Sequence, residues 1–191
     1  MKKSFFYFIL GLLIVSTIAF VKIDNTTSAN SDFADSFSKV LLHAKEYTLE
    51  VAEAMPEDGY TFRPTDSVRS FGEQMAHIGM SSKFILNTFI KGEKTDFDPA
   101  ASEKLEKELG MSKTEVVKLL NEAFDDVIEK LKSMNNESLD NTFVLFFDPS
   151  NPEFTKKQGF LFIRDHITHH RGQAIVSLRM KGEKAPSYRP F

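Results

Sequence analysis

Two histidines near the end of the chain have the spacing of metal ligands on a helix. His166 and His170 are four residues apart within a run that has helical periodicity. Residues at this spacing stack on one helical face, so the two imidazoles could reach a single ion. His169 offers an alternative partner, because on a regular helix it lies about 60° to one side of His166 while His170 lies about 40° to the other. The spacing predicts a metal site and leaves its second ligand open.

A third ligand has to come from another part of the chain. Cysteine is absent, so any transition metal must be held by His, Asp or Glu. His77 lies in the middle of a second helical run, beside small residues that would let another helix approach, and is the best candidate. His43 has no partner at helical spacing and is interpreted as an ordinary half-buried or surface residue.

Three polar residues near these histidines are weaker candidates for a role in catalysis. Glu73 precedes His77 by one helical turn and could orient a ligand or act as a base, although its place in a capping box explains it fully. Arg171 could bind a substrate carboxylate or pair with an acidic neighbour. Gln173, three residues after His170, could reach the same pocket.

Four amphipathic helices are expected to position these residues. Apolar side chains recur at steps of three and four in each of them. Capping-box patterns begin three of the helices, at Ser70, Ser112 and Thr155. The helices are expected over residues 32–54, 70–90, 112–135 and 155–181.

The connections between these helices are long. A polar segment is expected to carry a short helix over about residues 100–109. An apolar run at residues 141–147 is either a short strand or an extended loop, and no sheet is expected from it. Its phenylalanines either roof a pocket or belong to the core. The sequence therefore predicts an all-α fold, a four-helix bundle with long crossover connections.

Composition limits the architecture to one such domain. With 191 residues and 41% hydrophobic content, the chain can bury one good core. A net charge of -3, with Lys and Glu intermixed, argues against nucleic-acid binding. Residues 1–29 have the layout of a signal peptide or an N-terminal membrane anchor, which leaves residues 30–191 for the bundle. The domain is expected to be exported (periplasmic or extracellular), or anchored to the membrane by residues 5–21.

Two blocks of the sequence resemble the DinB-like family. The first block is Pro64 to His77 and the second is Asp165 to Gln173, and the segment from Leu178 to Pro186 is similar to the family's ending. The resemblance covers the chain from about Asp32 onward. It implies a four-helix bundle in which three histidines hold a divalent metal.

Carried over by motif, the three ligands implied by this resemblance are His77, His166 and His170, with His169 as a neighbour of the site. Relatives include metal-dependent hydrolases and thiol-dependent transferases, and members often form homodimers. Three neutral imidazoles would leave zinc or nickel with an open position, where a water or a thiol could lose its proton. Export weighs against a thiol substrate, because low-molecular-weight thiols are mainly cytoplasmic. The alternative is a non-catalytic metal-binding or helical interaction protein of the cell envelope.

Overall fold

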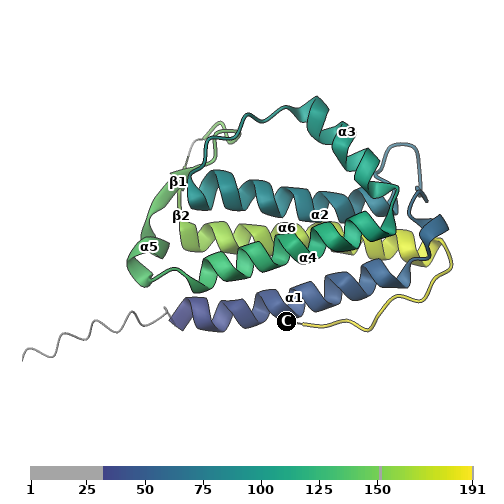
Figure 1. The fold of residues 1–191 in the computed structure, drawn as a ribbon, viewed down its shortest axis with the longest axis horizontal. Coiled ribbons are helices and arrows are strands. Elements are labelled where there is room, and N and C mark those ends of the chain that lie inside the picture. The colour runs from purple at the N-terminus through teal and green to yellow at the C-terminus, as the bar shows by residue number, and fades with distance from the viewer. Residues whose placement is uncertain (1–31, 151, 191) are drawn as a thin grey trace, which may run out of the picture.

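Helices form most of the part of the chain that the structure describes (Figure 1). The computed structural model describes residues 32–150 and 152–190. Within this part of the chain four long helices lie side by side, and the all-α bundle predicted from the sequence is confirmed. These helices are α1 (Asp32–Ala54), α2 (Phe71–Ile85), α4 (Lys113–Lys132) and α6 (Lys156–Met180), and α2 continues into the π-helical η2 (Leu86–Lys91).

Two of the long helices begin at complete capping boxes. At α2, Ser70 Oγ accepts from the backbone N–H of Glu73, whose carboxylate accepts from the backbone N–H of Ser70. At α6, Thr155 and Gln158 exchange the same pair of hydrogen bonds. A reciprocal pair satisfies two backbone donors that the first turn of a helix would otherwise leave unbonded. The sequence therefore locates the starts of both helices that carry candidate ligands.

Helix α2 is the central element of the bundle. It packs against α4 and α6, and the short helix α3 (Pro99–Gly110) covers a further part of it. The core that these helices enclose contains large side chains with less than 2% of their surface exposed, among them Tyr60, Phe71, Phe160, Leu41, Met75 and Leu120. Because α2 is surrounded in this way, most of its side chains are buried.

The smaller elements agree only in part with the sequence prediction. Helix α3 is the short helix expected near residues 100–109. The absence of a sheet was a wrong expectation, since β1 (Thr142–Val144) pairs with β2 (Glu153–Thr155) as an antiparallel ribbon. Strands of three residues are too short to show a period, and β2 runs directly into the cap of α6. A short helix α5 (Asn136–Asp140), which was not predicted, precedes β1.

The predicted signal peptide or anchor, residues 1–29, lies outside the described residues. Across the part of the chain that is described, no helix is both long enough and apolar enough to cross a membrane.

Candidate metal centre

Three histidines from two helices converge beside α3. His77 comes from α2, and His166 and His170 come from α6. Their ligand nitrogens all lie within 4.8 Å of one another, and the Nε2 atoms of His77 and His166 are 3.2 Å apart. Two nitrogens bound tetrahedrally to one zinc ion, at about 2.0–2.1 Å each, would be about 3.3 Å apart. The donor set and its spacing therefore fit a divalent transition-metal ion.

The structure separates the two histidine pairs that spacing alone left open. His166 and His170 both face His77, with ring centroids 4.4 Å apart from each other. His169 is exposed, and its Nε2 lies 2.8 Å from Nε2 of Gln173. His43 is also exposed, on α1. Neither of these two histidines belongs to the cluster found among the described residues.

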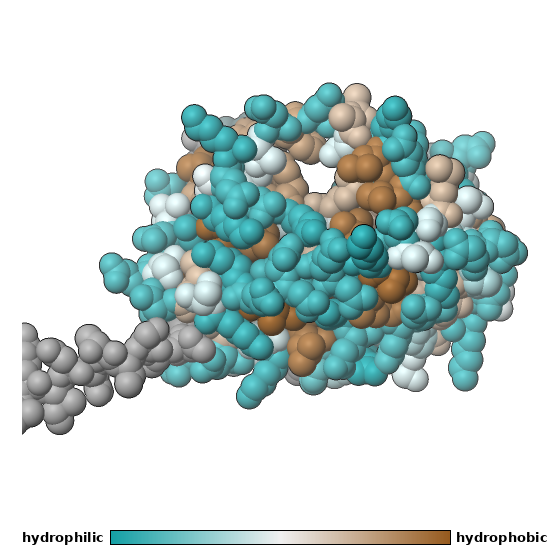
Figure 2. Space-filling model, in the orientation of Figure 1, coloured by the Kyte–Doolittle hydropathy of each residue, from teal (hydrophilic) through white to brown (hydrophobic). Residues whose placement is uncertain are grey.

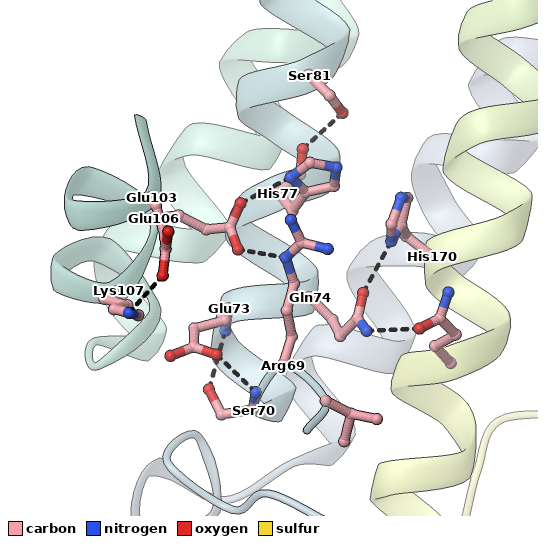
Figure 3. A network of polar contacts seen from close by, with 12 residues as sticks. Arg69, Ser70, Glu73, Gln74, His77, Ser81, Glu103, Glu106, Lys107 and His170 are labelled. Atoms are coloured by element: carbon pink, nitrogen blue, oxygen red, sulfur yellow. Dashed lines mark hydrogen bonds and ion pairs between the residues drawn. The ribbon is translucent and has the colours of Figure 1, made fainter. Parts of the chain in front are cut away.

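Hydrogen bonds orient two of the rings so that Nε2 faces the cluster. Nδ1 of His77 lies 2.7 Å from Oε2 of Glu106, and Nδ1 of His170 lies 2.8 Å from Oε1 of Gln74 (Figure 3). A carboxylate and an amide oxygen can only accept, so in both rings Nδ1 carries the proton. Each Nε2 then keeps a lone pair, as metal ligation by histidine requires.

Glu106 reaches the cluster from α3 and is itself held by Arg69. Its second oxygen accepts a hydrogen bond from Nε of Arg69, whose guanidinium lies beside the His77 ring (Figure 3). Burial raises the pKa of Glu106, but the hydrogen bonds from His77 and Arg69 outweigh burial and hold that pKa below its usual value. Glu106 is therefore a carboxylate near neutral pH. No periodicity or motif in the sequence pointed to Glu106, and Arg69, although it lies in the first block of the family resemblance, was not predicted as a site residue.

A chain of two side-chain amides holds the ring of His170. Gln74, buried on α2, donates from Nε2 to Oε1 of Gln173 at 2.8 Å. Since that bond fixes which end of the amide is the donor, the oxygen of Gln74 is turned toward His170. Gln173, a candidate from the sequence, thus acts on the cluster through Gln74.

Glu73 lines the same cavity as the histidines but is fully engaged. In addition to its capping bond, its two oxygens lie 2.6 and 2.7 Å from Nη2 of Arg63. A carboxylate bonded in this way is a structural group at the start of α2. Its position supports the cap interpretation rather than that of a free base.

Arg171 contacts neither of the partners that the sequence suggested, a substrate carboxylate and an acidic neighbour. Only 7% of its surface is exposed, and its Nη1 donates to Oγ1 of Thr48 at 3.2 Å. The guanidinium also lies 4.5 Å from the centroid of the Tyr47 ring. Arg171 is one residue past His170, and successive side chains on a helix are rotated by about 100° about its axis. The Arg171 side chain therefore lies toward α1 and away from the cluster. Arg171 therefore links α6 to α1.

Burial keeps two of the cluster histidines neutral. Burial, followed by repulsion from His77, lowers the pKa of His166 to about 4. The same two causes lower the pKa of His170 to about 3. An imidazole that stays neutral at pH 7 has its lone pair available without first losing a proton.

The cluster opens onto a large cavity. The cavity has a volume of about 850 Å³ and is lined by residues of α2, α3 and α6, including His77 and His166. Figure 2 shows an opening rimmed by hydrophobic residues, below the segment that joins η2 to α3. Small-molecule sites in proteins commonly fall in this range of volume. His77 and His166 can therefore be reached by a ligand of that size.

Two solved structures share this fold. A DinB-like protein from Bacillus cereus ATCC 10987 superposes with a TM-score of 0.63 at 17% identity, over 82% of this chain and 95% of that one. A DinB-like protein from Bacillus subtilis gives a TM-score of 0.58 at 19% identity, over 82% of this chain and 96% of that one. At these identities the likeness shows the fold alone. No curated protein matches the chain significantly.

The sequence itself shows the family. The family model described as the DinB superfamily matches residues 41–174, a range that contains all three histidines of the cluster. The match covers more than half of the chain and confirms the resemblance found in the two sequence blocks. The chain belongs to the DinB superfamily.

Proposed function

We propose that the protein is a divalent-metal-dependent enzyme, either a hydrolase or a thiol-dependent transferase, with His77, His166 and His170 as the metal ligands. The observation that supports this proposal most directly is the number of protein ligands that the cluster offers to a metal ion. Among the described residues the cluster has three protein ligands and faces an open cavity. Structural zinc sites are usually closed by four protein ligands, whereas catalytic sites keep one position for water or substrate.

The residues around the cluster support this role by holding it in place. Glu106 and Gln74 fix the rings of His77 and His170 before any ion arrives. A cation bound there would act as a Lewis acid and would lower the pKa of a coordinated water or thiol. The buried carboxylates that line the cavity, Glu73 and Glu106, are both engaged by arginines. A proton released at the site would therefore leave through the open cavity rather than pass to either of them.

The engaged carboxylates also support a second candidate, a metal-binding protein of the cell envelope without catalytic activity. Hydrolytic zinc enzymes commonly place a general base beside the bound water, as the glutamate of metalloproteases illustrates. A thiol needs less assistance than water because its ordinary pKa is lower, about 8.5. Metal-dependent turnover of any substrate would separate an enzyme from a metal-binding protein.

The test combines metal analysis with a screen for turnover. Purified protein should contain one metal per chain and should turn over a member of a panel of small esters, amides and thiol-plus-electrophile pairs. His77→Ala and His170→Ala should each remove both the metal and the activity, whereas the matched control His43→Ala should keep both. Full metal occupancy in both cluster variants, or turnover that survives a strong chelator, would refute the proposal.

Export and homodimer formation are further proposals, supported by the sequence and by the family resemblance. Sequencing the mature N-terminus in the native host tests export, and an intact Met1 on a cytoplasmic protein would overturn it. Light scattering of the purified domain tests the dimer.

A further inference from the structure

The residues that line the cavity change from metal ligands to aromatic side chains along the axis of α2. His77 and Phe84 both line it, on the same helix. Phe84 is seven residues beyond His77, which corresponds to about 10 Å along the helix at 1.5 Å per residue. Moving along α2 in this direction therefore leads from the metal ligands to an aromatic surface.

Helix α6 shows the same change from metal ligands to aromatic side chains. It runs antiparallel to α2, because His166 lies beside His77 while Gln173 lies beside Gln74. Phe162 is one turn before His166 and lines the cavity, with ring centroids 5.9 Å apart. Since the two helices run in opposite directions, Phe162 lies on the same side of the cluster as Phe84.

Helix α3 shows the same change from polar residues near the cluster to aromatic residues farther from it. Its Glu106 contacts His77, and Phe97, just before the helix begins, packs against Phe84 with ring centroids 5.0 Å apart. The segment after β1 adds Phe146, whose centroid is 6.5 Å from that of Phe84. Four separate segments thus supply one set of rings at this end of the cavity. We call it the phenylalanine pocket, formed by Phe84, Phe97, Phe146, Phe147 and Phe162.

Three of these rings are unusually exposed for their size. Phe97 is 50% exposed, Phe146 60% and Phe147 54%. Contiguous apolar surface left open to water commonly marks a binding site. Because these rings line the same cavity as the histidines, an apolar group held among them would belong to a molecule that also reaches the cluster.

The other end of the cavity is charged: three ion pairs and Asp66 line it, so acidic groups outnumber basic ones there by one. Arg63 pairs with Glu73, Arg69 with Glu106 and Lys107 with Glu103, and all six line the cavity. A divalent cation on three neutral imidazoles would add positive charge between these pairs and the rings. An electron-rich, polar head is therefore favoured at the cluster and an apolar tail in the phenylalanine pocket.

We infer that the site takes a small amphiphile, with an anionic or metal-coordinating head at the histidine cluster and an alkyl or aryl tail in the phenylalanine pocket. This inference rests on the proposed function, since the cation places the head. It specifies that proposal by giving the chemical class of the substrate and the residues that select it.

A series of hydroxamates with the same head and increasing tail length tests the inference. Acetohydroxamate, butanohydroxamate, hexanohydroxamate and octanohydroxamate would be titrated by calorimetry into the full zinc-loaded chain. Burying each methylene contributes about 0.8 kcal/mol, so each added pair should tighten binding about 15-fold until the pocket is full. Equal affinity for acetohydroxamate and octanohydroxamate would overturn the inference and leave the metal role standing.

Variants show whether the rings cause the gain. Phe97→Ala combined with Phe146→Ala should weaken octanohydroxamate binding at least tenfold and leave acetohydroxamate binding unchanged. Leu105→Ala is the matched control, since Leu105 is 47% exposed on α3 and is not a cavity-lining residue. An undiminished tail effect in the double variant would show that the tail binds elsewhere. A chain that bound neither zinc nor acetohydroxamate would defeat the proposed function and this inference together.

Discussion

The side chains that hold the histidine rings affect how tightly the cluster can bind a cation. Glu106 accepts from Nδ1 of His77, and Gln74 accepts from Nδ1 of His170. Rings that are already oriented lose less conformational freedom when an ion arrives, and a carboxylate partner also makes the opposite nitrogen more basic. Metal affinity should therefore depend on Glu106 although it is not itself a ligand.

Glu106→Gln is expected to weaken zinc binding about 10–100-fold, the usual effect of removing such a partner. The amide keeps the shape of the side chain but lacks the charge that pairs with His77 and Arg69. Competition titration against a zinc chelator of known affinity measures the change. Glu103→Gln is the control, because Glu103 lies on the same helix with 66% of its side chain exposed and pairs with Lys107 instead. A dissociation constant unchanged by Glu106→Gln would show that this contact does not tune the site.

The lowered histidine pKa values predict how the metal-free protein responds to acid. In the unfolded chain a histidine protonates near pH 6.5, whereas in the fold the pKa of His166 is about 4 and that of His170 about 3. Below pH 6.5 the unfolded state therefore binds more protons than the folded state. The free energy of unfolding should fall as the pH decreases from 6.5 toward 4.

Urea denaturation of the metal-free protein at pH 7, 6 and 5 measures this loss. The double variant with His166→Asn and His170→Asn should lose less stability over the same range, because its amides do not titrate. His43→Asn, on the exposed face of α1, should follow the wild type. The same pH slope in the wild type and the double variant would contradict the burial of neutral imidazoles.

Individual residues of the site were predictable from the sequence to different degrees. The spacing of His166 and His170 places them on one helical face whatever surrounds the helix, and the structure brings both to His77. Glu106 is 29 residues from His77 on a separate, mostly polar helix, so no local pattern connects the two. Arg171 shows the same limit, since helical spacing gives the direction of a side chain but not the element that packs there.

At the scale of elements, α3 approaches α2 closely enough for backbone to meet backbone. A Cβ atom on Gly110 would lie 2.7 Å from the backbone nitrogen of Glu73, and one on Gly72 would lie 1.8 Å from the carbonyl oxygen of Gly110. Only glycine fits at both positions. This contact sets the distance between α3 and α2, and with it the reach of Glu106 to His77.

Gly110→Ala should therefore push α3 away from α2. We expect a loss of about 1–3 kcal/mol in the free energy of unfolding, the usual cost of overpacking, together with weaker zinc binding. Urea denaturation and zinc competition measure the two effects. Gly172→Ala on α6 is the matched control, because a Cβ there meets nothing within 4 Å and should be neutral or slightly stabilising. Equal effects of the two substitutions would show that the glycine contact does not position α3.

Local signals in the sequence predicted the long helices but not the pairing of the two short strands. Ser70 and Thr155 mark the starts of α2 and α6, because a capping box requires only residues within one turn. The β1–β2 ribbon depends instead on pairing between segments that flank a turn, with Thr142 opposite Thr155. Its strands carry no repeated pattern, so only the tertiary contacts define them.

At the scale of the whole molecule, the histidine cluster connects parts of the chain that are far apart in sequence. His77 and His166 are separated by 89 residues, and Glu106 adds α3 to the same network. An ion bound to both α2 and α6 would be held by the folded protein and only weakly by the unfolded chain. Binding of this kind stabilises the fold by mass action.

Zinc should therefore raise the melting temperature of the metal-free protein. At a free concentration one hundred times the dissociation constant, the gain is about 2.7 kcal/mol, which for a chain of this length corresponds to roughly 5–10 °C. His77→Ala should abolish the shift, because α2 then provides no ligand, whereas His43→Ala should preserve it. Differential scanning calorimetry with and without zinc measures both. A shift of wild-type size in His77→Ala would mean that zinc binds elsewhere on the protein and that the cluster does not connect α2 to α6 through an ion.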